Sequence, residues 1–252
     1  MATKNIIKDI IVDKGYHDKL KVSQKETKML YGFVKESLLE GITKNNEKLF
    51  KKFKKINLKN YHKYSHLVDH KTIMQGKNRI IKPKNTLKIK KMLFYKKLEN
   101  IFSGFKILSF ENKYKDEVYW RIVRPNKNDA APLHQDFWFW SLNKRHIKNK
   151  FTRIKIWIPI ICEKGLNGLR YVHRSHLIKF DFTKKNKGKD GLLRPPIIKK
   201  KINAKIFKSD SGQSFIFNDK LIHGGLSGGK YTRVSLEFTM LVDDKVLRKH
   251  ID

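Results

Sequence analysis

The chain has 252 residues, of which 39% are hydrophobic, with 16 Phe and 4 Trp, so it is too apolar for a disordered protein and is sufficient for one large domain. Its single cysteine excludes an internal disulfide framework, and no apolar run approaches a signal peptide or the roughly 20 residues of a membrane-spanning helix, so we expect a cytoplasmic protein. The net charge of +35 is compatible with nucleic acid as a partner, but the basic runs are scattered, as on solvated surfaces, and we do not favour that partner.

The first part of the chain, residues 1–104, is expected to be mainly helical. Apolar residues recur at roughly helical spacing between positions 29 and 39, after Ser23 as an N-cap. The segment Ile81–Asn85 interrupts this pattern at its proline. A further helix is predicted over Leu87–Phe102, ending near Gly104 as its C-cap.

Three histidines in this helical part, His62, His66 and His70, recur every four residues and would share one face of a helix. Two such histidines can bind zinc. Because no cysteine or well-placed glutamate accompanies them, we favour a polar helix surface over a metal site.

From Phe105 the sequence changes to short runs of β-branched and aromatic residues, separated by Gly, Asn, Asp and Lys. Strands without intervening helices favour an antiparallel sandwich or barrel over residues 105–245, with a mobile loop over 184–191. The predicted strands are Lys106–Phe110, Val118–Arg124, Thr152–Pro159, Leu169–Val172, Ile197–Phe207, Ser214–Phe217 and Tyr231–Val242.

Within this β-rich part, His134 and Asp136 stand two positions apart. On an extended strand, residues i and i+2 point to the same face, so both side chains can bind one metal ion. His223, after another predicted strand, offers a third ligand. Two histidines and one carboxylate suit non-haem Fe(II) and leave open positions for reactants. Alone, a His-x-Asp triplet is a weak signal, because such a pair is often only hydrogen-bonded.

A candidate anion site follows the third ligand along the chain. Arg233 and Ser235 share one face of the last predicted strand. A guanidinium and a hydroxyl on one face form a good seat for a carboxylate. Three metal ligands followed by a carboxylate seat indicate a site for iron and a dicarboxylic cosubstrate.

These residues make the chain resemble the Fe(II)/2-oxoglutarate-dependent oxygenases of the phytanoyl-CoA dioxygenase-like (PhyH) family. The resemblance covers residues 119–242. It implies a mainly β fold, a double-stranded β-helix (jelly roll, cupin-like) flanked by N-terminal α-helices, in one oxygenase domain over residues 1–252. The motifs that carry it are Ala130–Asp136, Ile154–Pro159, Asn167–Leu169, Arg174–His176, His223 and Arg233–Ser235.

By matching position, the resemblance implies that His134, Asp136 and His223 bind Fe(II). It also implies 2-oxoglutarate and O₂ as cosubstrates, and hydroxylation of a C–H bond with release of succinate and CO₂. The carboxylate at Asp136 argues against a halogenase, in which that position is vacated for halide.

The cosubstrate residues follow in the same way. The resemblance implies that Arg233 pairs with the distal carboxylate of 2-oxoglutarate and that Ser235 assists. Trp157 stands where the family has an aromatic residue in the cosubstrate pocket, and core packing is an equal alternative for it. The step from His223 to Arg233 is one residue shorter than is common in the group, which a glycine-rich turn over 224–229 can absorb. His176 also matches the family, and we interpret it as a structural turn residue.

Four further residues are candidates for contact with the substrate. Tyr119 and Arg121 share one face of a predicted strand near the iron. Trp138 and Trp140 keep the parity of the metal ligands and would wall the pocket if the strand continues past Asp136; otherwise they are core or lid residues. Indoles beside an arginine suit a ring-bearing, sugar-like or anionic substrate.

The sequence therefore predicts a hydroxylase of a small, polar or anionic organic molecule. One alternative is the same chemistry on a nucleic acid or on an acyl chain at a membrane, suggested by the net charge. Another is a non-catalytic jelly-roll binding module with vestigial ligands. The helical first part is a candidate lid or dimer surface, and the oligomeric state is left open.

Overall fold

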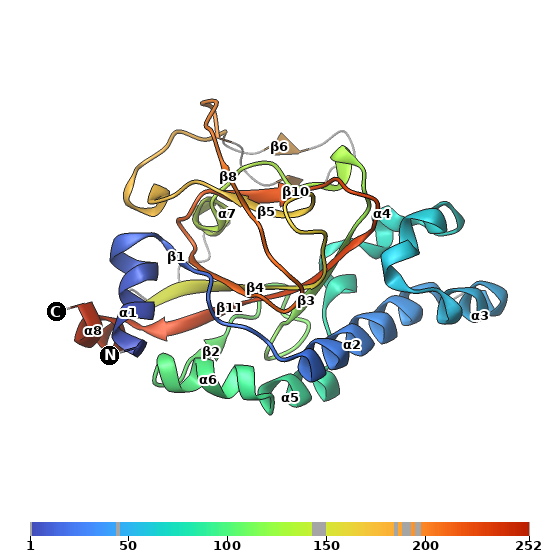
Figure 1. Ribbon diagram of the computed structural model, residues 1–252, viewed down its shortest axis with the longest axis horizontal. Coiled ribbons are helices and arrows are strands. Elements are labelled where there is room, and N and C mark those ends of the chain that lie inside the picture. Colours follow the sequence, from blue (N-terminus) through green and yellow to red (C-terminus); the bar gives the residue numbers. More distant parts are fainter. Residues whose placement is uncertain are drawn as a thin grey trace.

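A computed structural model describes residues 2–43, 46–142, 150–183, 186–187, 193–194 and 198–251. A layer of helices, a six-stranded sheet and a three-stranded sheet are stacked in that order (Figure 1). The helices and helical turns are α1 (Ala2–Lys8), η1 (Asp9–Asp13), α2 (Gln24–Thr43), α3 (Glu47–Lys55), η2 (Leu58–Lys63), η3 (Ser65–Leu67), α4 (His70–Ile73), η4 (Gly76–Arg79), α5 (Pro83–Lys90), α6 (Leu93–Ile101), η5 (Lys127–Asp129), α7 (Asp136–Leu142), η6 (Ser175–Leu177) and α8 (Asp244–Ile251).

All strand pairs are antiparallel. The six-stranded sheet has the order β1-β9-β4-β11-β2, with β3 also paired to β11, and the three-stranded sheet has the order β10-β5-β8. β6 pairs with β7 separately. The strands are β1 (Tyr16–His17), β2 (Lys106–Ile107), β3 (Tyr119–Val123), β4 (Phe151–Ile161), β5 (Gly168–Tyr171), β6 (Asn186–Lys187), β7 (Leu193–Arg194), β8 (Lys205–Phe207), β9 (Phe215–Asn218), β10 (His223–Leu226) and β11 (Arg233–Asp243).

The two long strands β4 and β11 separate a core from a cavity. On β4, Ile154 and Ile156 belong to the main core, which they share with the helices, whereas Lys155 and Trp157 line a cavity on the opposite face. This alternation is the period-two pattern of a strand that is covered on both faces. On β11 the same alternation separates the core residues Val234, Leu236, Phe238 and Met240 from the cavity residues Arg233, Glu237 and Thr239.

The helical layer follows the sequence expectation in part. Ser23 caps α2: its hydroxyl accepts the Glu26 N–H at 3.2 Å, and the Glu26 carboxylate accepts the Ser23 N–H at 3.0 Å, a capping box. The single helix predicted over Leu87–Phe102 was wrong, because two helices stand there. The first, α5, already starts at Pro83, since a proline in the first helical position has no N–H left unbonded.

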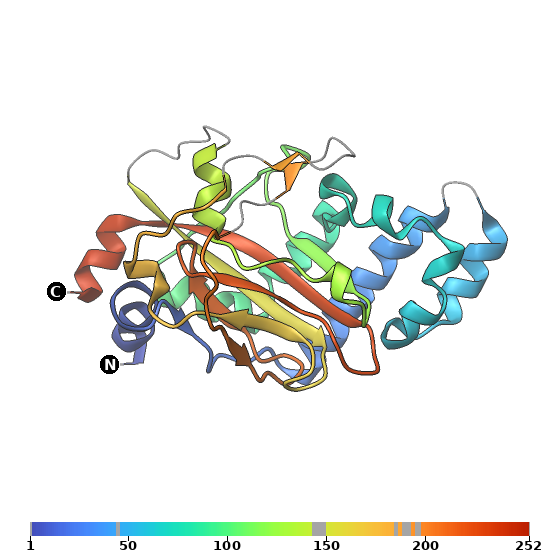
Figure 2. The ribbon, with the colours of Figure 1, turned by 90° about the horizontal axis from the view of Figure 1, so that it is seen from above.

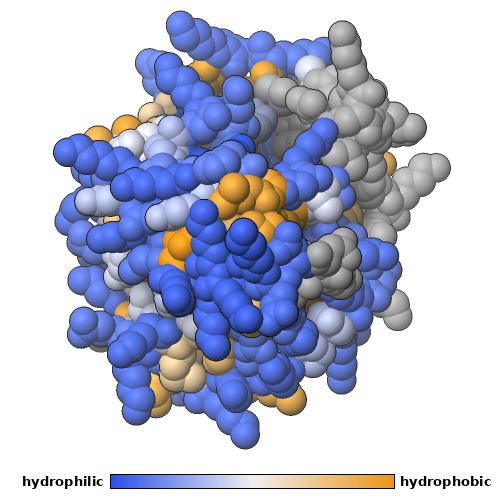
Figure 3. Space-filling model, turned by 90° about the vertical axis from the view of Figure 1, so that its right-hand side faces the viewer, coloured by the Kyte–Doolittle hydropathy of each residue, from blue (hydrophilic) through white to orange (hydrophobic). Residues whose placement is uncertain are grey.

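The helices also bring the two ends of the chain together. α1 and α8 contact each other at the same end of the molecule (Figure 2). At the opposite end, α3 exposes Lys51, Lys52, Lys54 and Lys55 around the buried Phe53. This end is largely hydrophilic, with one apolar patch near its centre (Figure 3). The basic run in α3 therefore lies on a solvated surface.

Each predicted strand overlaps an observed one, but two strands are shorter than predicted, and a predicted turn and a predicted loop contain strand residues. Lys106–Phe110 is a strand only to Ile107, because the chain then turns and the Phe110 N–H donates to the Glu117 carboxylate. In the segment predicted from Ile197, which itself lies outside the described residues, the strand covers only Lys205–Phe207. The turn predicted over 224–229 begins as strand β10. The loop predicted over 184–191 lies largely outside the described residues, and its residues 186–187 form β6.

Candidate metal centre

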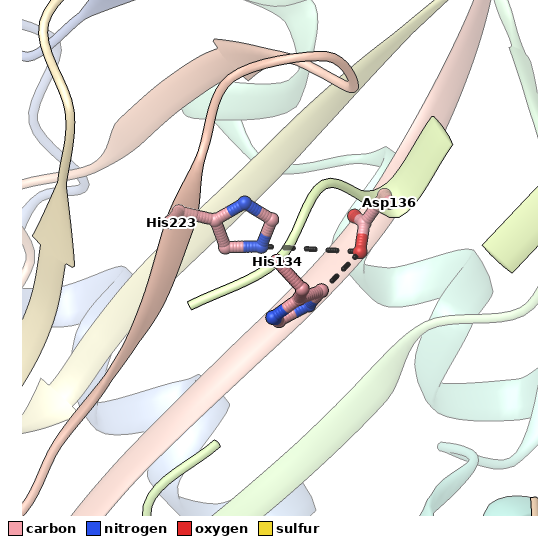
Figure 4. Close-up of side chains that lie close together, drawn as sticks. All are labelled: His134, Asp136 and His223. Carbon is pink, nitrogen blue, oxygen red and sulfur yellow. Dashed lines mark ion pairs between the residues drawn. The ribbon is translucent and has the colours of Figure 1, made fainter. Parts of the chain in front are cut away.

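Main-chain pairing places two histidines side by side. His134, in the loop after η5, forms an isolated antiparallel bridge with His223, the first residue of β10. The N–H of each donates to the C=O of the other at 2.9 Å. Because directly paired strand residues project to the same face, the two imidazoles lie together, with ring centroids 4.5 Å apart (Figure 4).

Glycine at the two positions after His223 allows this close approach. A Cβ on Gly224 would lie 2.8 Å from the carbonyl oxygen of Pro132, and a Cβ on Gly225 would lie 2.8 Å from the amide nitrogen of Ala131. Both contacts are with backbone, which cannot move aside as a flexible side chain can. The loop that carries His134 therefore packs against β10 only because these side chains are missing.

Each imidazole is held in one tautomer by its own backbone. Nδ1 of His134 lies 2.8 Å from the Pro132 carbonyl oxygen, and Nδ1 of His223 lies 3.0 Å from the Leu221 carbonyl oxygen. Because a carbonyl only accepts, Nδ1 carries the hydrogen in both rings and Nε2 presents a lone pair. Such second interactions orient histidine ligands in metal sites.

Asp136 was predicted to extend from the same strand as His134, and this was wrong: it is the first residue of α7. The chain turns because the Phe137 N–H donates to the Asp219 carbonyl at 3.0 Å. The turn still directs the carboxylate inward. Its Oδ1 lies 3.5 Å from His134 Nε2 and 3.8 Å from His223 Nε2 (Figure 4).

These three side chains fit a metal ion. Their ligand atoms lie within 4.8 Å of one another. Among the described residues, this is the one group of three or more His, Cys, Asp or Glu side chains placed to hold a metal ion. The second carboxylate oxygen of Asp136, Oδ2, is buried without a hydrogen-bond partner, and the Lys155 ammonium lies 3.7 Å from it, so this oxygen keeps capacity for a further cation. Two neutral imidazoles and one carboxylate with open positions are the donor set that suits non-haem Fe(II).

The protonation states also suit a metal. Burial and the nearby His134 lower the pKa of His223 to about 4, so its imidazole is neutral near pH 7. Burial alone would raise the pKa of Asp136, but Lys155 and the two histidines outweigh it and hold that pKa well below its ordinary value. Metal binding requires neutral histidine and ionised aspartate, and both are already present.

The rival histidine set does not form a site. His62, His66 and His70 lie in η2, η3 and α4, not on one helix, so the predicted shared helix face was wrong. The His62 ring nitrogen Nδ1 pairs with the Thr232 hydroxyl at 2.9 Å. His70 is largely buried, and its Nε2 lies 3.3 Å from the Asp129 carboxylate.

Two of the predicted cosubstrate residues, Arg233 and Trp157, lie on the wall of the same cavity, whereas Ser235 is not among its lining residues. Arg233 is 2% exposed, its Nη1 donates to the Gly168 carbonyl, and its Nε has no hydrogen-bond partner. The guanidinium lies 5.9 Å from the ring centroid of Trp157. Ser235 is buried two residues further on, and its hydroxyl is also unpartnered. A buried, incompletely paired guanidinium favours an anion beside it.

The metal site and Arg233 open into one cavity of about 460 Å³. Three of the four predicted substrate residues, Tyr119, Arg121 and Trp140, line it. Trp138 does not line it: the strand ends before Asp136, and Trp138 takes the alternative core role, buried and stacked on Phe182 at 4.8 Å. The reason is the helix: with 3.6 residues per turn, positions 136 and 140 share a face and position 138 points away.

Sequence reasoning missed five charged residues of the cavity, namely Lys155, Glu237, Arg79, Glu111 and Asp129. Strand parity could have found two of them, because Lys155 stands two positions before Trp157 and Glu237 four positions after Arg233 on the same strands. Arg79 comes from η4 in the helical part, where no pattern points to the cavity. His176 is buried in η6 and is not among the cavity residues.

The fold is shared with known enzymes at low sequence identity. The apo form of the non-heme monooxygenase ThoJ aligns over 94% of this chain and 77% of its own, with 10% identity and a TM-score of 0.57. The non-heme alpha ketoglutarate dependent carbocyclase SnoK from nogalamycin biosynthesis aligns over 95% and 83%, with 9% identity and a TM-score of 0.54. EvdMO1 aligns over 94% and 49%, with 14% identity and a TM-score of 0.52.

These similarities confirm the predicted fold, a jelly roll with flanking helices. No family model matches the chain, and a search of the curated proteins gives no match. The resemblance to the PhyH group therefore stays a prediction. In the described part of the chain, no helix has both the length and the apolar character needed to cross a membrane.

Proposed function

We propose that this chain is an Fe(II)- and 2-oxoglutarate-dependent dioxygenase that hydroxylates a C–H bond of a small organic molecule, in a single oxygenase domain of the PhyH type. One observation carries the proposal: His134, Asp136 and His223 converge in a cavity that also holds a buried, incompletely paired Arg233. The first three supply a facial ligand set, and the arginine supplies a partner for a carboxylate.

His134, Asp136 and His223 would hold the iron, which together with 2-oxoglutarate and O₂ supplies the oxidation of the substrate with release of succinate and CO₂. The backbone fixes both histidine tautomers through Pro132 and Leu221. These ligands are therefore oriented before the metal binds, and little reorganisation is needed.

The remaining residues would orient the cosubstrate and exclude water. Arg233 would bind the distal carboxylate of 2-oxoglutarate through its free guanidinium edge, with Ser235 beside it. Trp157 would form the wall against which the cosubstrate lies, because its indole packs over Arg233 and lines the cavity. A cavity closed by such groups strengthens every electrostatic contact inside it.

The cavity supports a small molecule as the substrate. Its volume, about 460 Å³, lies within the range typical of small-ligand sites. Similar folds carry different reactions, since SnoN from the same pathway as SnoK is named as an epimerase, with a TM-score of 0.51. We propose hydroxylation because it is the simplest oxidation of a C–H bond that the ligand set supports.

The proposal is tested by turnover of 2-oxoglutarate without added substrate. Protein supplied with Fe(II), ascorbate and 2-oxoglutarate in air should form succinate slowly, and Asp136→Ala should reduce the rate to that of protein-free solution. An exposed histidine variant, His66→Ala, should keep the rate of the wild type. Equal succinate formation by the wild type and Asp136→Ala would contradict the proposal.

A further inference from the structure

A charged cluster lies in the cavity beside the proposed metal ligands and Arg233. Three cations from three elements surround the carboxylate of Glu237 on β11: Arg79 from η4, Arg121 from β3 and Lys155 from β4. Their nitrogens lie 3.8, 4.0 and 3.9 Å from its oxygens. All three distances exceed those of hydrogen bonds. The charged groups are therefore close together, but the three cations make no hydrogen bond to Glu237.

The cations of this cluster have unused hydrogen-bonding capacity. The side chain of Arg79 is only 14% exposed. Its Nε and Nη1 atoms are buried and have no hydrogen-bond partner. Its guanidinium lies over the ring of Tyr119, with 5.7 Å to the centroid, which fixes its plane. A buried guanidinium whose donors are unpaired carries a desolvation cost that an anion would remove.

The charge balance favours an anion. The charges of Fe(II) and Arg233 would balance those of Asp136 and 2-oxoglutarate. Among the other charged residues of the cavity lining are the cations Arg79, Arg121 and Lys155 and the carboxylates Glu237 and Glu111. The lining carboxylate of Asp129 is already paired with Arg124 outside the cavity. One positive charge is therefore left without a counter-charge.

Glu237 acts as a counter-ion within this cluster. Burial alone would raise its pKa, but the charges of Lys155, Arg121 and Arg79 outweigh burial and lower the pKa to about 2. Glu237 is therefore ionised near pH 7 and offsets part of the positive charge of the three cations. An incoming anion would add the hydrogen bonds that Glu237, at nearly 4 Å, does not make.

An aromatic wall adjoins the charged cluster. Phe110 lies 4.7 Å from Phe139 and 5.1 Å from Trp140 between ring centroids, and all three line the cavity. The first pair is tilted and the second edge-to-face, and a further ring or an apolar body can pack on such aromatic surfaces. The cavity thus combines a cationic end with an aromatic wall.

Building on the proposed function, we infer that the substrate is an organic anion whose carboxylate binds Arg79 and Arg121 and whose apolar body packs on Phe110, Phe139 and Trp140. Paired guanidinium groups match the two oxygens of a carboxylate better than a neutral amide or hydroxyl. Lys155, between Glu237 and Asp136 at 3.9 and 3.7 Å, would keep the cluster next to the metal.

Three nearly isosteric probes test this inference: benzoate, benzamide and benzamidinium, which carry a negative, zero and positive charge. Each is titrated by calorimetry into protein that holds Fe(II) and saturating 2-oxoglutarate without oxygen. We expect benzoate to bind at least about 10-fold more tightly than benzamide, because charge-assisted hydrogen bonds are stronger than neutral ones, and benzamidinium to bind most weakly.

Two substitutions of opposite sign separate a charge effect from a structural one. Arg121→Gln should weaken benzoate binding about 10-fold, and Glu237→Gln should strengthen it, because the second removes the competing carboxylate. A structural role for the cluster would weaken binding in both. Arg248→Gln removes an exposed arginine on α8 and should leave the affinity unchanged.

The titrations distinguish failure of this substrate inference from failure of the proposed function. If the sample does not bind 2-oxoglutarate, the proposed function fails and this inference with it. If 2-oxoglutarate binds but benzoate shows no preference over benzamide, or no probe binds, only this inference is overturned. Weaker benzoate binding in Glu237→Gln would overturn it as well.

Discussion

Asp129 and Arg124 close the two ends of the loop that leads from β3 towards the metal ligands. The Asp129 carboxylate accepts from Nε and Nη2 of Arg124, both at 2.8 Å, and from the Arg124 N–H at 3.0 Å. His70, itself paired with the Tyr61 hydroxyl at 2.9 Å, reaches the same carboxylate. The helical part of the chain thus braces the loop that carries His134.

Asp129→Asn should therefore destabilise the fold near pH 7, by about 1.5–3 kcal/mol, because hydrogen bonds to a charged group are lost. Urea unfolding measures this difference. The exposed pair Lys164–Asp210, 2.9 Å apart, provides the control, since Asp210→Asn should change stability by about 1 kcal/mol or less. Equal effects of the two substitutions would contradict a bracing role for Asp129.

The effect of Asp129→Asn should also depend on pH. Burial would raise the pKa of Asp129, but Arg124 and His70 outweigh burial and hold it well below the ordinary value of 3.8. A carboxyl group whose pKa is depressed by folding stabilises the protein above its unfolded pKa and loses this contribution as the pH falls. The difference between wild type and variant should be complete near pH 7 and shrink below about pH 3.8, and a constant difference would exclude this cause.

The approach of the loop to β10 gives a second prediction. Gly224→Ala would place a Cβ 2.8 Å from the Pro132 carbonyl oxygen and push the loop of His134 away from His223. Steric strain of about 1–3 kcal/mol corresponds to about a 5- to 150-fold rise in the Kd for a divalent metal, measured by calorimetry. Gly32→Ala in α2 meets open space and should leave metal binding unchanged, while slightly stabilising the helix.

The role of Arg233 gives a third prediction. Arg233→Gln should raise the Kd for 2-oxoglutarate about 10- to 100-fold, because a charge-assisted pair is lost, and should leave the Kd for the metal unchanged. Both constants follow from titrations of the same protein. Loss of metal binding together with cosubstrate binding would assign Arg233 a structural role instead.

Strand periodicity in the sequence was sufficient to place several residues on the wall of the cavity. Arg233, Trp157 and Arg121 lie on regular strands, where alternate residues share a face, and each lines the cavity. The same alternation extends to Lys155 and Glu237, whose role was not predicted although their parity was visible.

Local turns and long-range contacts were not readable in the same way. Asp136 begins a helix, because the Phe137 N–H bonds to the distant Asp219, and this contact has no local signature. The change from strand to helix also turned Trp138 away from the cavity. Arg79 reaches the cluster from the helical part, which only the tertiary packing brings to β3, through a bridge between Ile80 and Tyr119.

We propose that His134, Asp136 and His223 together would hold one ferrous ion, with 2-oxoglutarate as its further ligand. Without oxygen, Fe(II) and 2-oxoglutarate together should give the wild type the weak visible charge-transfer absorption of that chelate. His134→Ala, Asp136→Ala and His223→Ala should each abolish the band, while the exposed variant His66→Ala retains it. An unchanged band in any of the three ligand variants would contradict the assignment of the metal site.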